Sequence, residues 1–177
     1  MQARTELLSL EDLYLFNTGQ LFRAYQTFGA HPMTIDGREG VRFVVWAPNA
    51  REVSVVSDSN DWGQGKPGYP LEPVGTTGVW CGFVTEMGEG DRYKYAILNA
   101  NGELVLKSDP HAIHCELRPR TASIVAELDR YRWKDQSWMA RKQTESPYDK
   151  PMLIYEVHLG SWRMDAPEQF RTYEELS

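Results

Sequence analysis

Three side chains of this sequence are suited to binding a sugar, and Trp62 is the first of them. It lies in the polar run DSNDWG, residues 58–63, which ends in glycine and has no apolar periodicity. An exposed indole offers a flat apolar surface, and the CH face of a pyranose ring can stack on it while the sugar hydroxyls remain hydrogen-bonded at the rim. The alternative is that Trp62 folds back over the edge of its domain, because tryptophan is highly buried on average.

Asn60 and Lys94 are the other two candidates for carbohydrate binding. Asn60 stands in the same polar run as Trp62, and its amide can hydrogen-bond sugar hydroxyls. Lys94 alternates with Tyr93 and Tyr95, so a strand would place its ammonium on the face opposite the two aromatic rings. The alternative for Lys94 is an ordinary solvated strand face, since most lysines are exposed.

The histidines and cysteines do not form a recognisable metal or disulfide pattern. His31, His111 and His114 are spaced unlike the ligands of a zinc site, and no cysteine or carboxylate cluster joins them. We therefore expect neither a metal nor another cofactor. Cys81 and Cys115 form no CxxC pair and no disulfide framework, which indicates a reducing cytoplasm.

Composition limits the classes of partner. The chain has 177 residues, 41% of them hydrophobic, and 19 basic against 25 acidic side chains. This predicts one main folded domain with a short appendage, and the acidic balance disfavours nucleic acid and membrane surfaces as partners. The N-terminus lacks the apolar core of a signal peptide, and no apolar run is long enough to span a bilayer, so we expect a cytoplasmic protein.

Periodicity predicts short helices followed by an all-β domain. Residues 9–29 have helical spacing, with Ser9 as an N-cap and a break near residues 17–19. From Gly40 onward the period is two, which predicts about seven strands in an immunoglobulin-like antiparallel β-sandwich. The first two predicted strands, 41–45 and 53–55, are expected to form a hairpin. Further strands are expected at 79–83, 93–97, 104–106 and 123–125.

The pattern of polar and apolar residues changes after the predicted sandwich. Residues 139–150 are polar and aperiodic, which is typical of a connection between domains. Residues 152–157, MLIYEV, are mostly apolar, as expected for a strand covered on both faces of a parallel sheet. A parallel (β/α)8 barrel needs about 250 residues, so only its beginning would fit here. The predicted organisation is helical residues 1–35, sandwich 36–138, linker 139–150 and an incomplete barrel from 151 to 177.

Several segments together resemble bacterial glycogen branching enzymes. They are FGAHP (28–32), GVRFVVWAPNAREVSVV (40–56), YKYAILNANGELVLKSDPHA (93–112), RPRTAS (118–123) and LIYEVHLGSWR (153–163). The resemblance implies that the sandwich is a family 48 carbohydrate-binding module and that IYEVH opens the first strand of an α-amylase-type barrel. It also implies that Trp62 and Lys94 contact sugar. Glucan-binding relatives carry a second tryptophan where this chain has Gly102, Glu103 and Leu104, so a strong isolated site is not expected.

The resemblance implies an activity that this chain would not perform alone. Branching enzymes transfer cut α-1,4 chains into α-1,6 branches with retention, which needs a carboxylate nucleophile and a carboxylic acid. Those groups come from later barrel strands, and Glu156 is the single carboxylate within 152–157. The expected partners are α-1,4-glucans (glycogen, amylose, maltooligosaccharides) and the catalytic barrel of the same protein. Two alternatives are a stand-alone glucan-binding module and the front end of a debranching or trehalose-releasing hydrolase, although HLGSW favours a branching enzyme.

Overall fold

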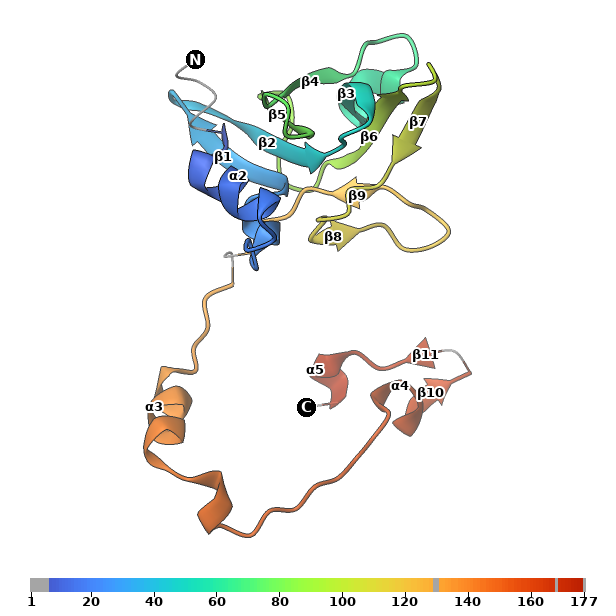
Figure 1. The fold of residues 1–177 in the computed structure, drawn as a ribbon. Coiled ribbons are helices and arrows are strands. Elements are labelled where there is room, and N and C mark those ends of the chain that lie inside the picture. The colour runs from blue at the N-terminus through green and yellow to red at the C-terminus, as the bar shows by residue number, and fades with distance from the viewer. Residues whose placement is uncertain (1–6, 129–130, 168, 177) are drawn as a thin grey trace. The chain divides into compact units, whose positions relative to one another are not determined.

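The chain divides into two units, residues 1–131 and 132–177. The computed structural model describes residues 7–128, 131–167 and 169–176. The first unit is built almost entirely of strands, and the second contains short helices and one small hairpin (Figure 1).

Nine strands of the first unit form one antiparallel sheet in the order β1-β2-β5-β4-β3-β6-β9-β8, with β7 paired to β6. The sheet curls so that its two halves face one another (Figure 1), which confirms the predicted immunoglobulin-like β-sandwich. The strands are β1 Gly29–Ile35, β2 Arg38–Trp46, β3 Ala50–Ser57, β4 Tyr69–Pro73, β5 Val79–Val84, β6 Arg92–Asn99, β7 Leu104–Lys107, β8 His114–Cys115 and β9 Ser123–Ile124.

Alternate residues of these strands point inward and form the core, as the period of two predicts. The ring of Phe43 meets that of Tyr93 edge to face, with centroids 5.1 Å apart. The hydroxyl groups of Tyr93 and Tyr95 both donate to Oδ2 of Asp109, at 2.6 and 3.1 Å. The buried tyrosines of β6 are thus tied to the loop that follows β7, which fixes how β6 is oriented in the sandwich.

The hairpin predicted between residues 41–45 and 53–55 is wrong, although both strands are present. β2 pairs with β1 and β5, whereas β3 pairs with β4 and β6. The two-residue hairpin turns of types I′ and II′ need positive φ at their first central residue, and Pro48, in that position of the turn Ala47–Ala50, has φ fixed near −65° by its ring. The turn instead carries the chain from one layer of the sandwich to the other.

From residue 8 onward, two short helical pieces precede the sheet, with the break where the sequence predicts it. Helix α2, Leu10–Asn17, begins after Ser9, whose hydroxyl accepts a hydrogen bond from the amide of Asp12 at 3.0 Å. A single 3-10 turn, η1, covers Ala24–Gln26. The apolar side of this segment packs on the outer side of β2 and β5 against Val44, Val79 and Cys81.

Three strands of the sandwich were not predicted, and their sequences explain why. Proline cannot donate to a strand ladder and therefore argues against a strand in a sequence pattern. β1 contains Pro32, and β4 contains Pro70 and Pro73. β8 spans two residues, too few to show alternation. Residues 1–35 are therefore not wholly helical, because their last seven residues form β1.

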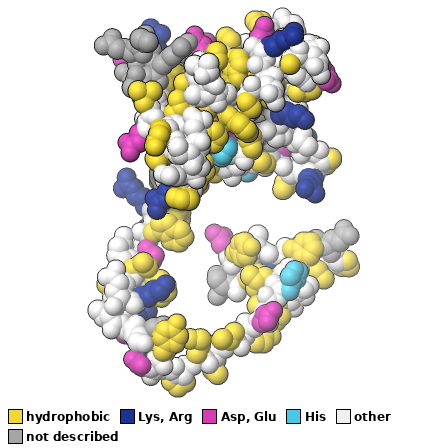
Figure 2. Space-filling view, in the orientation of Figure 1, with side chains coloured by type: hydrophobic (Ala, Val, Ile, Leu, Met, Phe, Trp, Pro, Cys, Tyr) yellow, Lys and Arg dark blue, Asp and Glu magenta, His cyan; other side chains and the backbone are white. Residues whose placement is uncertain are grey.

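The second unit differs from its prediction. The connection predicted at 139–150 contains most of a helix, and residues 152–157 form no strand. No strand of the described residues pairs with 152–157, and an unpaired segment cannot form a sheet ladder. Its hydrophobic side chains lie at the surface (Figure 2), with Leu153 fully exposed. The elements of this unit are α3 Gln136–Thr144, η3 Pro147–Asp149, α4 Leu159–Trp162, β10 Met164–Ala166, β11 Gln169–Phe170 and α5 Tyr173–Leu176.

Candidate functional site

The turn η2, Asp58–Gly63, directly follows β3 and carries both Asn60 and Trp62. The side chain of Asn60 is buried, with 3% of its surface exposed. Its Oδ1 accepts a hydrogen bond from the amide of Ser57 at 2.9 Å, and its Nδ2 donates to the carbonyl of Val55 at 3.1 Å. The amide that we predicted to contact sugar is therefore engaged in shaping the turn.

The backbone at Trp62 adopts an unusual conformation. Trp62 has φ 56° and Asp61 has φ 53°, both in the left-handed region. This region is uncommon for residues other than glycine, and holding a bulky side chain there costs about 1–3 kcal/mol. The hydrogen bonds of Asn60 help to offset that cost. The turn thus presents the indole in an orientation that an ordinary helical or extended backbone would not give.

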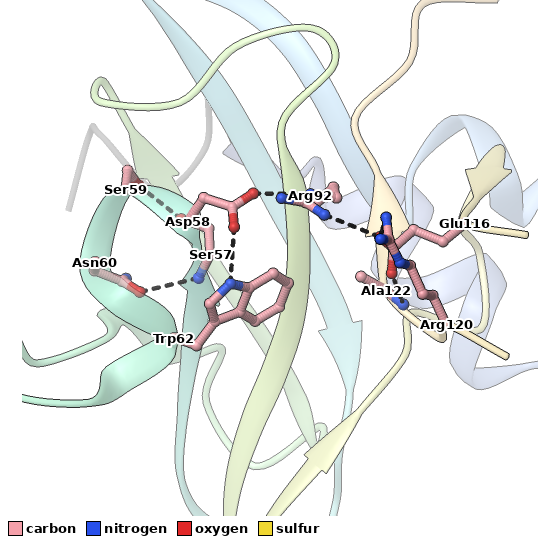
Figure 3. Close-up of polar contacts among 9 residues, drawn as sticks. All are labelled: Ser57, Asp58, Ser59, Asn60, Trp62, Arg92, Glu116, Arg120 and Ala122. Atoms are coloured by element: carbon pink, nitrogen blue, oxygen red, sulfur yellow. Dashed lines mark hydrogen bonds and ion pairs between the residues drawn. The ribbon is translucent and has the colours of Figure 1, made fainter.

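The indole is also held by its nitrogen. Nε1 of Trp62 donates to Oδ1 of Asp58 at 2.9 Å, and Oδ2 of Asp58 accepts a hydrogen bond from Nε of Arg92 at 2.9 Å (Figure 3). The only polar atom of the ring is thereby satisfied within the protein. Trp62 is half-buried, so part of its apolar ring remains accessible.

Arg92 extends this contact to a second carboxylate. Its Nη1 donates to Oε1 of Glu116 at 3.2 Å, and Oε2 of Glu116 accepts the backbone N–H of Ala122 at 3.0 Å (Figure 3). Arg120 lies 3.8 Å from the same carboxylate. The hydrogen bond from Ala122 and then the guanidinium of Arg92 lower the pKa of Glu116, while hydrogen bonds to Glu116 and Asp58 raise the pKa of Arg92. Both groups are therefore charged at neutral pH.

Lys94 follows on the same face of β6, two residues beyond Arg92. Its Nζ donates to the hydroxyl of Thr121 at 2.8 Å, and the side chain is partly exposed. Trp62 and Lys94 line one shallow hollow with a volume of about 400 Å³. Its lining residues are Trp62, Arg92, Lys94, Leu106, Glu116, Arg120, Thr121 and Ala122.

The structure therefore brings together two of the three predicted residues, Trp62 and Lys94, and gives Asn60 a supporting position. Sequence reasoning missed the charged residues beside them. Arg92 could have been predicted, because alternation along the strand places it on the same face as Lys94. Glu116 and Arg120 could not have been predicted, because they are distant from β6 in the sequence and lie beside it only after the chain has folded.

The described residues contain neither a metal-binding cluster nor a membrane-spanning helix. Within residues 7–128, 131–167 and 169–176, no group of three or more His, Cys, Asp or Glu side chains is placed to hold a metal ion. No helix in that same part of the chain has the length and apolar character needed to cross a membrane. Cys81, which is buried, and Cys115, which is exposed, are free thiols.

Comparison with known proteins identifies relatives of the first unit and of the whole chain. Residues 27–112 match the family described as carbohydrate-binding module 48 (isoamylase N-terminal domain). The chain is 44% identical to a 1,4-alpha-glucan branching enzyme of Bacillus subtilis over 94% of its own length and 26% of that enzyme. It is 45% identical to the branching enzyme of Oleidesulfovibrio alaskensis over 100% of its own length and 28% of that enzyme.

The chain thus spans about a quarter of the length of these curated relatives. Among solved structures, ligand-free PulA from Klebsiella pneumoniae aligns with a TM-score of 0.47 and 26% identity, over 64% of this chain and 11% of that one. Residues 27–112 belong to the carbohydrate-binding module 48 family, in a chain that is similar over nearly its whole length to 1,4-alpha-glucan branching enzymes.

Proposed function

We propose that the first unit is the α-glucan-binding module of a 1,4-alpha-glucan branching enzyme and that glucan binds in the hollow between Trp62 and Lys94. The observation that supports this proposal is that Trp62 and Lys94 line the same hollow, although one lies on η2 and the other on β6. Both were expected to contact sugar from sequence alone. The relatives named above are branching enzymes, which supports α-1,4-glucans such as glycogen, amylose and maltooligosaccharides as the ligands.

The hollow has the chemistry that a glucose unit requires. The accessible part of the Trp62 ring stacks on the CH face of the sugar, and because its N–H is already bound to Asp58, the ring acts purely as an apolar platform. Lys94 and Arg120 carry several N–H donors each, which suit sugar hydroxyl oxygens. A shallow, open hollow of this kind favours weak binding to a long polymer over tight capture of one sugar.

In the complete enzyme, this module would hold glucan near the site of transfer. We assign the transfer of cut α-1,4 chains into α-1,6 branches to a catalytic barrel in which residues 152–157, which form no strand in the chain by itself, would pair as the first strand. The exposed apolar side chains of that segment support this assignment, since a barrel would cover them. The free thiols Cys81 and Cys115 suit a cytoplasmic enzyme.

Calorimetric titration of the chain with maltoheptaose tests the proposed site. Trp62→Ala should raise the dissociation constant about fivefold or more, because a stacking contact on an aromatic side chain contributes roughly 1–3 kcal/mol. Trp138→Ala is the matched control, since Trp138 is 48% exposed but lies on α3 in the second unit. An unchanged affinity after Trp62→Ala, or an equal loss after Trp138→Ala, would remove Trp62 from the site.

A further inference from the structure

The hollow at Trp62 occupies one end of a longer sheet face. Tyr93 and Tyr95 of β6 point into the core, so the alternate residues Lys94, Ala96 and Leu98 point outward. Directly opposite residues of an antiparallel pair point to the same side of the sheet. β3 therefore adds its own outward row beside β6, through the pairs Val56↔Lys94, Ser54↔Ala96 and Glu52↔Leu98.

A second hollow of about 330 Å³ lies farther along this outward face. Its outward-facing lining residues on the strands are Glu52 and Ser54 of β3, Ala96 and Leu98 of β6, and Leu104 of β7. Pro67, Gly68 and Pro70 also line it, together with the buried core residues Val53, Leu71 and Trp80. It holds no residue of the Trp62 hollow, so the two are separate recesses on one sheet face.

Strand β7 connects the two recesses. Leu106 pairs with Ala96 and lines the first hollow, while Leu104 pairs with Leu98 and lines the second. Leu106 is 48% exposed and Leu104 is 65% exposed, on a strand that pairs only with β6 among the described residues. Exposed edge strands usually carry charges, and neighbouring exposed leucines are typical of a binding surface.

We propose that an α-glucan chain stacked on Trp62 continues along β6 into this second hollow, so that the module recognises a run of glucose units. The inference rests on the proposed function of the first hollow. Lys94 and Leu98 are separated by about 13 Å along the strand, at roughly 3.3 Å per residue, which is longer than one sugar ring. Ala96 lies between them, and its methyl group projects little from the strand.

The second hollow contains both kinds of contact that a glucan needs. Leu98 and Leu104 offer apolar surface for CH faces. The carboxylate of Glu52 accepts hydrogen bonds from sugar hydroxyls, and the Ser54 hydroxyl both donates and accepts. Neither side chain is hydrogen-bonded or ion-paired to another described residue, so both are available. A glucan is the occupant we assign to this surface because it is also the ligand proposed for the adjoining first hollow.

Calorimetric titration of the full chain with maltotriose and with maltoheptaose tests the extension. The unaltered protein should bind maltoheptaose about tenfold more tightly than maltotriose. Leu104→Ser should raise the dissociation constant for maltoheptaose about five- to tenfold while leaving that for maltotriose within about twofold, since it removes apolar contact only beyond the first hollow. Glu52→Ala should show the same selectivity. Leu10→Ser, at a residue 76% exposed on α2, is the matched control.

Two results distinguish the proposed extension from the proposed glucan binding at the Trp62 hollow. Equal affinities for maltotriose and maltoheptaose would overturn the extension, and so would equal losses of affinity for both after Leu104→Ser. The proposed function would still stand if Trp62→Ala weakened the binding of both sugars. Affinities that do not respond to Trp62→Ala would overturn the proposed function and the extension together. Thermal unfolding of each variant establishes that it remains folded, as expected for changes at exposed positions.

Discussion

The indole nitrogen of Trp62 donates to one oxygen of Asp58 at 2.9 Å, while the other oxygen of Asp58 accepts a hydrogen bond from Arg92 at 2.9 Å. Asp58 thus joins the turn η2 to strand β6 through a single carboxylate. The direction of the Trp62 ring depends on this carboxylate because the ring has no other polar atom. Glucan binding should therefore respond to Asp58 even though the carboxylate faces the protein.

Substitution of Asp58 separates the role of its oxygen from that of its charge. Asp58→Ala should weaken maltoheptaose binding about three- to tenfold, since a hydrogen bond of this kind contributes roughly 1 kcal/mol. Asp58→Asn keeps an oxygen acceptor for the indole and should lose less affinity. In a Trp62→Phe background, which has no ring N–H, Asp58→Ala should have little further effect. An equal loss in both backgrounds would show that Asp58 does not act through Trp62.

Asn60→Ala should lower the free energy of unfolding by about 1–3 kcal/mol, because it leaves the amide of Ser57 and the carbonyl of Val55 without their partner. Urea denaturation followed by tryptophan fluorescence measures the change. Gln64→Ala, at an exposed residue just after the turn, is the control and should change stability little. A neutral result for Asn60→Ala would contradict its role in shaping η2.

Glu116 should make stability depend on pH in the acidic range. Its pKa is lowered in the folded state, chiefly by the N–H of Ala122, so folding favours its charged form. The resulting stabilisation is present above the unfolded pKa of about 4.5 and is lost as the pH falls through the lower folded value. Measured between about pH 7 and pH 3, the stability difference between the parent chain and Glu116→Gln should shrink toward the acidic end. A difference that stays constant, or one that Glu39→Gln reproduces, would exclude this linkage.

The chain alone should not branch amylose. Retaining transfer between glucans needs two carboxyl groups on opposite sides of the scissile bond, and Glu156 is the single carboxylate in the apolar segment 152–157. The absorbance of the iodine complex with amylose should therefore stay constant during incubation with the purified chain. A fall in absorbance that scales with the amount of chain, and not with that of a mock preparation, would contradict the assignment of the catalytic carboxylates to later strands of the barrel.

Local signals in the sequence determined which residues form most strands and where the first helix begins. The alternation of Val41, Phe43 and Val45 reports which side of a strand is buried, and Ser9 marks a helix start because its hydroxyl caps the first turn. Trp62 and Lys94 could likewise be proposed as sugar contacts from their residue types and surroundings. None of these inferences requires knowledge of a distant part of the chain.

The tertiary structure alone decided which strands pair and which side chains meet. The separation of β2 from β3 and the inclusion of the proline-containing β4 depend on backbone groups elsewhere in the sheet. Glu116 reaches Arg92 across 24 positions of sequence. Such contacts are set by how the sheet curls, which no residue pattern encodes locally, because their free energy appears only when distant segments pack together.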